Sequence, residues 1–175
     1  MANLACISRT VCETKPTITA IHAVFHSNMA YNILNWGGTS EKNLNQILIS
    51  QKKALRAIFK MKNDESCKLL FTDNRILTVY AHFVLEIVCY VHKHSDELHS
   101  ERYEHRYETR NKNLLQNKFT KLDIVKNSPE QTGIRFFNIL PEKLKQLPFK
   151  HFKRIVKNLL VEFTSYNLKE AKDCS

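Results

Sequence analysis

Apolar residues recur at spacings of three and four along most of the chain, which is the pattern of amphipathic α-helices. The first such run extends from Ile18 to Trp36 and ends at two glycines, which favour a helix C-terminus. A second helix is predicted over residues 41–61, with Thr39 and Ser40 as candidate N-cap residues. Its apolar face adjoins an arc of lysine and arginine, so one side can enter a core while the neighbouring side stays positively charged.

The next long run, residues 76–93, is apolar on more than one stripe, which predicts the central and most buried helix of the fold. A shorter helix is predicted before it, from Asn63 to Phe71. After it, residues 95–121 are dense in His, Glu, Arg and Asn and lack an apolar period. We expect this stretch to form a long polar loop or an extended arm.

Beyond the polar stretch, Leu122 to Val125 fits either a short strand or a turn. The last helix is strongly amphipathic, and its apolar side includes Phe149, Phe152 and Phe163, with lysine and arginine beside it. The helices predicted in this half of the chain cover residues 131–140, 142–147 and 149–163.

These elements predict an all-α fold, an irregular small helical bundle with a long polar arm between helices. The 3 glycines and 4 prolines in 175 residues support this class, because β-sandwiches and barrels need many tight turns. The expected organisation is a weakly structured segment, a helical subdomain, the arm, a C-terminal helical segment and a tail, in this order: residues 1–17, 18–94, 95–121, 122–164 and 165–175.

Basic residues outnumber acidic ones, with 27 Lys and Arg against 17 Asp and Glu and a formal net charge of +10. This excess indicates an anionic partner, nucleic acid before a membrane surface. No apolar run reaches the roughly 20 residues that span a bilayer, and no signal peptide is recognisable. The 5 cysteines are scattered without a C-x-x-C pair, which fits a reducing compartment. We therefore expect a nuclear or cytoplasmic protein with no membrane partner.

No catalytic constellation is recognisable in the sequence. A polymerase needs paired acids that hold two metal ions, and no Asp-Asp pair occurs, nor does a phosphate-binding glycine motif. Cys89, His92, His94 and His99 form a single irregular cluster, whereas zinc sites use paired ligands at fixed short spacings. We expect no enzyme activity, no cofactor and no metal site, and a metalloenzyme or hydrolase using this cluster is the least favoured alternative.

The candidate binding residues are basic clusters on two predicted helices and in the arm, where tyrosines are interleaved. Cations that neutralise phosphates, with aromatic rings on which bases stack, form a sequence-tolerant nucleic-acid surface. The opposing interpretation is that amphipathic helices commonly carry lysine on solvated faces. The predicted nucleic-acid-binding residues are Lys42, Lys52, Lys53, Arg56, Lys60, Arg106, Tyr107, Arg110, Lys112, Lys150, Lys153, Arg154 and Lys157.

Four segments together resemble the region that follows the polymerase domain in non-LTR (LINE-like, Jockey- or CR1-type) retrotransposon reverse transcriptases. The positions Asn32, where the family usually has Gly, and Ser50, where it has Leu or Val, depart from the pattern. The segments are FHSNMAYNILNWGGT (residues 25–39), LISQKKALRAIF (residues 48–59), HRYETRNK (residues 105–112) and GIRFFNILPEKLK (residues 133–145).

The resemblance implies a non-catalytic, thumb-like fragment that helps to hold template RNA or target DNA, since the catalytic Asp-Asp motif of the family lies upstream of this region. It implies RNA or DNA as a partner, and a reverse-transcriptase core domain as a second one. By the same resemblance Phe25, Tyr31 and Trp36 are core or docking residues, and Tyr107 with Arg110 belongs to a defined arm. The alternative is a helical protein-interaction module, a docking remnant with no nucleic-acid role.

Overall fold

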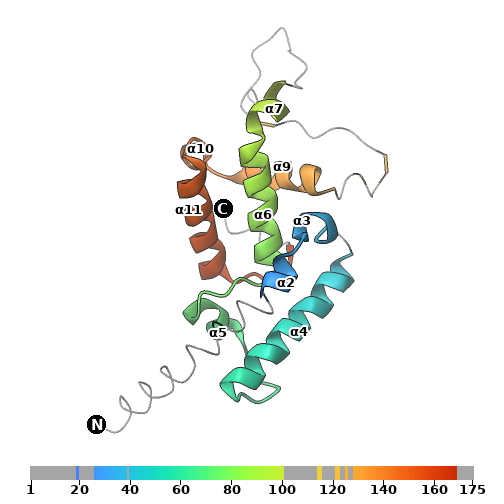
Figure 1. Cartoon of the computed structure of the whole chain (residues 1–175), viewed down its shortest axis with the longest axis vertical. Helices are drawn as coiled ribbons and strands as arrows, with labels where there is room; N and C mark the ends of the chain where they lie inside the picture. The colour runs from blue at the N-terminus through green and yellow to red at the C-terminus, as the bar shows by residue number, and fades with distance from the viewer. Residues whose placement is uncertain are drawn as a thin grey trace, which may run out of the picture.

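The structure, a computed structural model, describes residues 19, 26–38, 40–100, 114–115, 121–122, 125 and 128–168. These residues form helices joined by short connections, and none of them lies in a β-strand (Figure 1). The prediction of an all-α fold is therefore confirmed. In chain order the helices are α2 (Ser27–Ala30), α3 (Ile33–Trp36), α4 (Glu41–Phe59), α5 (Lys68–Asp73), α6 (Val79–Lys93), α7 (Ser95–Ser100), α9 (Pro129–Ile139), α10 (Glu142–Lys145) and α11 (Phe149–Phe163).

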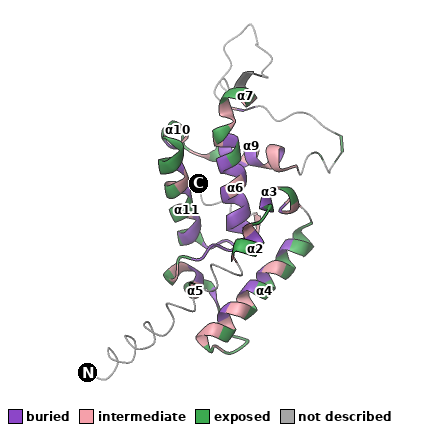
Figure 2. Cartoon of the chain, viewed as in Figure 1, coloured by how far each residue is buried: buried purple, intermediate pink, exposed green. Residues whose placement is uncertain are grey.

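Helix α6 is the centre of the fold, as its apolar sequence predicts. The Thr78 hydroxyl caps its N-terminus by accepting a hydrogen bond from the backbone N–H of Ala81 at 3.2 Å. Every residue from Val79 to Val91 is buried except Glu86 and Tyr90 (Figure 2). Helices α9 and α11 pack against it most extensively, and α3 and α4 also contact it.

Two apolar clusters meet at α6. The larger joins Ile87 of α6 to Ile134 of α9 and Phe152 of α11. The smaller holds Leu48 of α4 and Phe71 of α5 beneath the first turn of α6. A single helix cannot bury its own apolar face. Each cluster combines the apolar faces of several helices, so their burial holds the helices together.

The approach of α9 to α6 depends on Gly133. A Cβ atom at this position would lie 2.7 Å from Cγ2 of Val91 and 3.0 Å from the carbonyl oxygen of Ile87. Both distances are shorter than ordinary van der Waals contact, so the two helices pack more closely here than any larger residue would allow.

Helix α4 is tied to the start of α6 by the buried side chain of Gln51. Its Nε2 donates to the carbonyl oxygen of Leu77 at 2.7 Å, and its Oε1 accepts from the backbone N–H of Val79 at 3.2 Å. Further along α4, Nε and Nη2 of Arg56 donate to the carbonyl oxygen of Glu65 at 3.3 and 2.9 Å. These bonds fix the connection between α4 and α5.

The N-terminal helix differs from the prediction. The described residues form α2 and α3 in place of one continuous helix, with the break at Tyr31 and Asn32. Asn32 has a φ of 55°, a left-handed conformation that asparagine tolerates better than most residues. The indole N–H of Trp36 donates to the carbonyl oxygen of Tyr31 at 2.8 Å, which satisfies a backbone group at the break. Periodicity alone did not indicate this break.

Three further boundaries differ or become defined. Helix α5 begins at Lys68, five residues after the predicted start at Asn63. Residues 95–100, predicted as the start of the polar arm, form α7, whose first turn carries two acids that favour a helix N-terminus. The backbone N–H of Val125 donates to the carbonyl oxygen of Leu122 at 3.1 Å, which favours the turn of the two predicted alternatives.

Candidate nucleic-acid interface

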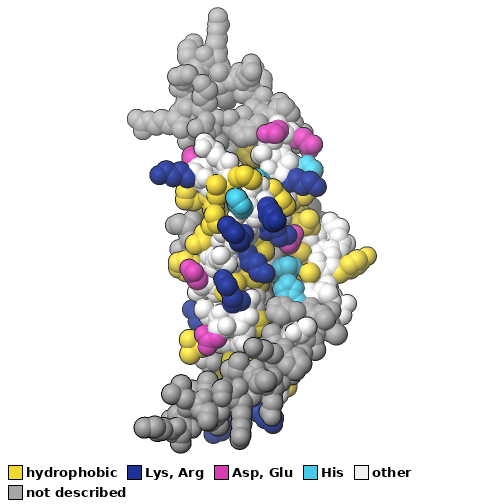
Figure 3. All heavy atoms as spheres, turned by 60° about the vertical axis from the view of Figure 1, so that its left-hand side comes forward, with side chains coloured by type: hydrophobic (Ala, Val, Ile, Leu, Met, Phe, Trp, Pro, Cys, Tyr) yellow, Lys and Arg dark blue, Asp and Glu magenta, His cyan; other side chains and the backbone are white. Residues whose placement is uncertain are grey.

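Helix α11 carries a basic face beside the face that it buries. Phe152, Val156 and Leu160 are buried against the rest of the fold. At about 3.6 residues per turn, its basic residues fall on one arc that adjoins this buried side. Lysine and arginine side chains gather on this face of the molecule, over α11 (Figure 3). The basic residues of this arc are Lys150, Lys153, Arg154 and Lys157.

The four cations are not equivalent. Nζ of Lys153 forms an ion pair with Oε1 of Glu86 at 2.9 Å, which links α11 to α6 across their contact. Lys150, Arg154 and Lys157 are exposed, and no acidic partner holds them in the part of the chain that the structure describes. Their charges are therefore available to an anion from outside.

Arg75 extends this face, although the sequence analysis did not include it. It precedes α6, and its Nη2 donates to Oδ1 of Asn158 at 3.0 Å. Asn158 lies one helical turn beyond Arg154 on α11, so the guanidinium lies near the C-terminal half of the basic arc. No local signal could have indicated this position, because Arg75 stands alone in the sequence and 83 residues from its partner.

Aromatic side chains lie at the N-terminal end of the same arc. Phe149 is 44% exposed and Phe163, at the opposite end of α11, is 50% exposed. The prediction that both belong to the buried apolar side is therefore wrong in part, because the helix ends extend beyond the core. The ring of Phe149 lies 6.0 Å from that of His92, which in turn stacks on Phe152 at 4.1 Å.

On α4 the predicted binding residues separate into two groups. Lys52 and Arg56 make contacts within the protein: the Lys52 ammonium lies 3.6 Å from the ring centroid of Tyr166, and Arg56 holds the carbonyl of Glu65. Exposed cations on α4 are spread along the helix, and α4 and α11 lie on different sides of α6 (Figure 1). The exposed group is Lys42, Lys53 and Lys60.

The predicted arm residues Arg106, Tyr107, Arg110 and Lys112 lie outside the described residues, as does Phe25. Of the other residues named through the resemblance, Trp36 packs against both apolar clusters, whereas Tyr31 is 80% exposed and does not belong to the core.

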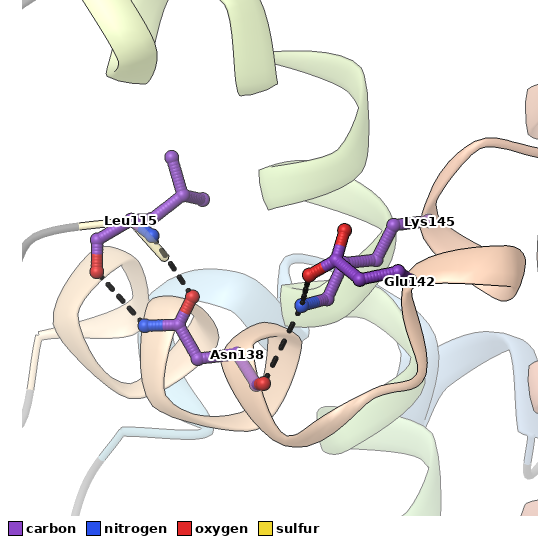
Figure 4. Close-up of polar contacts among 4 residues, drawn as sticks. All are labelled: Leu115, Asn138, Glu142 and Lys145. Carbon is purple, nitrogen blue, oxygen red and sulfur yellow. Dashed lines mark hydrogen bonds and ion pairs between the residues drawn. The ribbon is translucent and has the colours of Figure 1, made fainter. Parts of the chain in front are cut away.

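Leu115, in the later part of the predicted arm, is held by the side chain of Asn138 on α9 (Figure 4). Its Nδ2 donates to the carbonyl oxygen of Leu115 at 2.8 Å, and its Oδ1 accepts from the backbone N–H of Leu115 at 3.0 Å. The backbone oxygen of Asn138 accepts a further bond from Nζ of Lys145 at 3.4 Å, and Nζ also pairs with Glu142 at 3.0 Å. Leu115 is therefore fixed to α9.

A buried histidine lies next to the basic face. His82 of α6 is 7% exposed, and neither of its ring nitrogens has a hydrogen-bond partner in the described part of the chain. The His26 ring meets it edge-on at 4.6 Å. Burial is the main cause that lowers the pKa of His82 to about 4, and the nearby His26, Lys153 and Lys157 lower it further while Glu86 opposes them. His82 is therefore neutral at pH 7.

The described residues show no group of three or more His, Cys, Asp or Glu that could hold a metal ion. Burial raises the pKa of Cys89 to about 11, so this thiol is protonated at pH 7 and unsuited to nucleophilic attack. None of the described helices has both the length and the apolar character that a membrane crossing requires.

The basic arc of α11, extended by Arg75 and bordered by Phe149, is thus the most concentrated candidate site in the described residues. Helix α11 supplies four cations of this site, and the segment before α6 supplies the fifth, Arg75. Glu86 of α6 forms an ion pair with Lys153. Comparisons of the chain with protein-family models, with curated proteins and with solved structures find no match.

Proposed function

We propose that this chain is a non-catalytic, helical nucleic-acid-binding module whose main contact surface is the basic face of α11. The observation that carries the proposal is the set of three exposed cations, Lys150, Arg154 and Lys157, on one arc of a helix whose adjoining side is fixed in the core. A fixed helix presents its charges without first having to be ordered, which lowers the entropic cost of binding.

The spacing of these cations suits a phosphate backbone. From Lys150 to Lys157 the helix rises about 10 Å at 1.5 Å per residue. A nucleic-acid strand of B-form rise carries about one charge per 3.4 Å, so the arc faces about three phosphates. Such contacts position the ligand without reading bases, which makes the binding tolerant of sequence. The exposed lysines of α4 remain a predicted second contact, weaker because they are far apart along their helix.

The resemblance to the region after the polymerase domain of non-LTR retrotransposon reverse transcriptases supports the same role. In that setting the module would hold template RNA or target DNA beside a reverse-transcriptase core domain. The sequence has no Asp-Asp pair, so polymerase chemistry would belong to that partner.

The test is fluorescence anisotropy of the purified chain with labelled single-stranded RNA and with duplex DNA, at salt concentrations from 50 to 300 mM. We expect the logarithm of the affinity to fall linearly with the logarithm of the salt concentration. With three to four phosphates neutralised, the slope should be about −2 to −4. The absence of binding to either ligand at the lowest salt concentration would refute the proposal.

A second candidate function, docking to another protein, rests on a different surface. Leu69 of α5 is 73% exposed and Phe163 of α11 is 50% exposed. These two helices are joined where the hydroxyls of Thr72 and Thr164 lie 3.1 Å apart. Exposed apolar side chains of this kind favour association. Sedimentation of the chain at increasing concentration tests this candidate, which predicts self-association that Leu69→Ser and Phe163→Ser weaken.

A further inference from the structure

We infer that the α11 face selects single-stranded over duplex nucleic acid, and that Phe149 is a platform on which an unpaired base stacks. This inference rests on the proposed function and adds the class of ligand to it. It commits the face to nucleic acid, and an anionic membrane surface is one outcome that the test can return.

Phe149 lies in the first turn of α11, where the apolar side of the helix extends beyond the core, and it adjoins the basic arc. Lys153 follows it by four positions, one turn along the helix, and Lys157 follows by two turns. Going round the helix at about 100° per residue, Lys153, Lys157, Lys150 and Arg154 follow Phe149 within about 140°. Leu160 and Val161 fall in the same span but are buried, and they lie in the C-terminal half of α11. An aromatic ring and the phosphate-binding cations therefore face the same ligand.

The ring of Phe149 is held in place from behind. It meets the ring of His92 at 6.0 Å and an angle of 47°, and His92 is stacked on the buried Phe152 at 4.1 Å and 25°. Nε2 of His92 lies 3.1 Å from the carbonyl oxygen of Leu147, which fixes the imidazole. Phe149 is nonetheless 44% exposed, so part of a positioned ring remains open to a ligand.

A second exposed ring lies on α6 along the same border. The ion pair of Glu86 with Lys153 places this part of α6 beside α11. Tyr90 lies one helical turn further along α6, on the same side as Glu86. It is 39% exposed, and its ring lies 4.6 Å from that of His94. Since His92 contacts Phe149 while Glu86 contacts Lys153, α6 runs antiparallel to α11, and Tyr90 lies toward the Phe149 end.

This combination distinguishes single strands from duplexes. In a duplex the faces of the bases are covered by neighbouring base pairs, whereas an unpaired strand presents them to aromatic side chains. Stacking accepts every base because each has a π-face, so it adds affinity without sequence preference. Neutralising phosphates requires only cations, whereas stacking of bases requires an exposed aromatic ring beside them.

The experiment compares three ligands of equal length: a single-stranded oligothymidylate, an abasic deoxyribose-phosphate strand and a DNA duplex. Wild type and Phe149→Leu are titrated with each at 50 mM salt. We expect wild type to bind oligothymidylate more tightly than the abasic strand. Phe149→Leu should lower the affinity for oligothymidylate about 5- to 100-fold and leave the affinity for the abasic strand unchanged.

The matched control is Phe163→Leu, which makes the same change on the same helix at a ring that is 50% exposed but lies at the opposite end of α11, about 21 Å along the axis from Phe149. It should bind all three ligands as wild type does. A 2-aminopurine base placed in the single strand provides a direct readout, because stacking on Phe149 should quench its fluorescence in wild type and not in Phe149→Leu.

Equal binding of the oligothymidylate and abasic strands, with no effect of Phe149→Leu, would overturn the inference and leave the proposed function standing. Absence of binding to all three ligands would overturn both. Binding to vesicles that contain phosphatidylserine, with none to the strands, would overturn both in favour of a membrane surface.

Discussion

At the scale of single residues, His82 is the clearest case of a polar group buried beside charge. Both ring nitrogens are without a hydrogen-bond partner in the described residues. The surrounding groups are His26, which precedes α2, Glu86 of α6, and Lys153 with Lys157 of α11. Burial is the main cause that lowers the pKa of His82 to about 4, and the neighbouring His26 and the two ammonium groups lower it further. The lysines of the basic face therefore help to keep the neighbouring His82 neutral.

A dependence of stability on pH follows from this. The unfolded chain protonates this histidine near pH 6.5, whereas in the folded chain the pKa is about 4. The contribution of His82 to the free energy of unfolding is therefore complete above pH 6.5 and falls as the pH decreases toward 4, by about 3 kcal/mol in all.

Urea unfolding at several pH values between 7.5 and 4.5 measures this effect, and His82→Phe should reduce the loss of stability on acidification. The matched control is His151→Gln, since His151 is exposed. Parallel pH profiles for wild type and His82→Phe would contradict the assignment.

Gly133 gives a second prediction at this scale. In an exposed helix, replacing glycine by alanine stabilises by about 1 kcal/mol. Here the added Cβ would lie 2.7 Å from Val91 and 3.0 Å from a backbone oxygen of α6, so we expect Gly133→Ala to destabilise by about 1–3 kcal/mol.

The check is a double-mutant cycle by urea unfolding. In a Val91→Ala background the shortest contact is removed, so Gly133→Ala should cost less there. A stabilising effect of Gly133→Ala in the wild-type background would show that α6 and α9 are not packed as described.

At the scale of elements, side-chain to backbone hydrogen bonds fix how the helices connect. Trp36 closes the break between α2 and α3, Gln51 ties α4 to α6, Arg56 holds the connection after α4, and Asn138 holds Leu115. All four residues lie in the segments that resemble the reverse-transcriptase pattern. Their roles in the structure are structural, so a shared pattern at these positions would reflect the fold and not a binding site.

Asn138 provides the test at this scale. In Asn138→Asp the donor to the carbonyl of Leu115 is lost and a carboxylate faces that oxygen, so we expect destabilisation of about 1–3 kcal/mol. Hydrogen exchange at the Leu115 amide should accelerate, because the hydrogen bond from Asn138 to the Leu115 carbonyl no longer holds this residue on α9. Unchanged exchange at Leu115 would show that the Asn138 bonds do not hold it.

The long helices could be predicted because their apolar faces repeat with the helical period over many residues, as in α4, α6 and α11. The break at Asn32 could not, because a single left-handed residue leaves the period of its neighbours nearly unchanged. The four cations of α11 were predicted for the same reason of local spacing. Arg75 could not be predicted, because only the packing of α11 against the segment before α6 brings Arg75 to the basic arc. The exposure of Phe149 could not be predicted either, because it depends on where the core ends along α11.

At the scale of the whole molecule, the buried helix α6 supports both α11, which carries the concentrated basic face, and α4, whose exposed lysines are far apart. Helix α6 anchors α11 through Glu86 and Lys153, and on its other contacts it packs against α4 and α9. A net charge of +10 would attract any polyanion weakly. The proposed function requires more, namely that the affinity depends on where the charges are and not only on their sum.

The most direct measurement compares two variants with the same loss of charge. One replaces Lys150, Arg154 and Lys157 of α11 by glutamine. The other replaces Lys42 and Lys53 of α4, together with Lys60 at its C-cap, by glutamine. All six residues are exposed, so both variants should fold as wild type does, which circular dichroism checks. Each is titrated with single-stranded RNA by fluorescence anisotropy over 50 to 300 mM salt.

We predict that the α11 variant loses at least about tenfold in affinity and that its salt slope becomes shallower by about 2, as expected for three lost phosphate contacts to a single strand. The α4 variant should lose less than about threefold. Equal losses in the two variants would show that only the net charge matters, and an unchanged α11 variant would contradict the assignment of the interface to this helix.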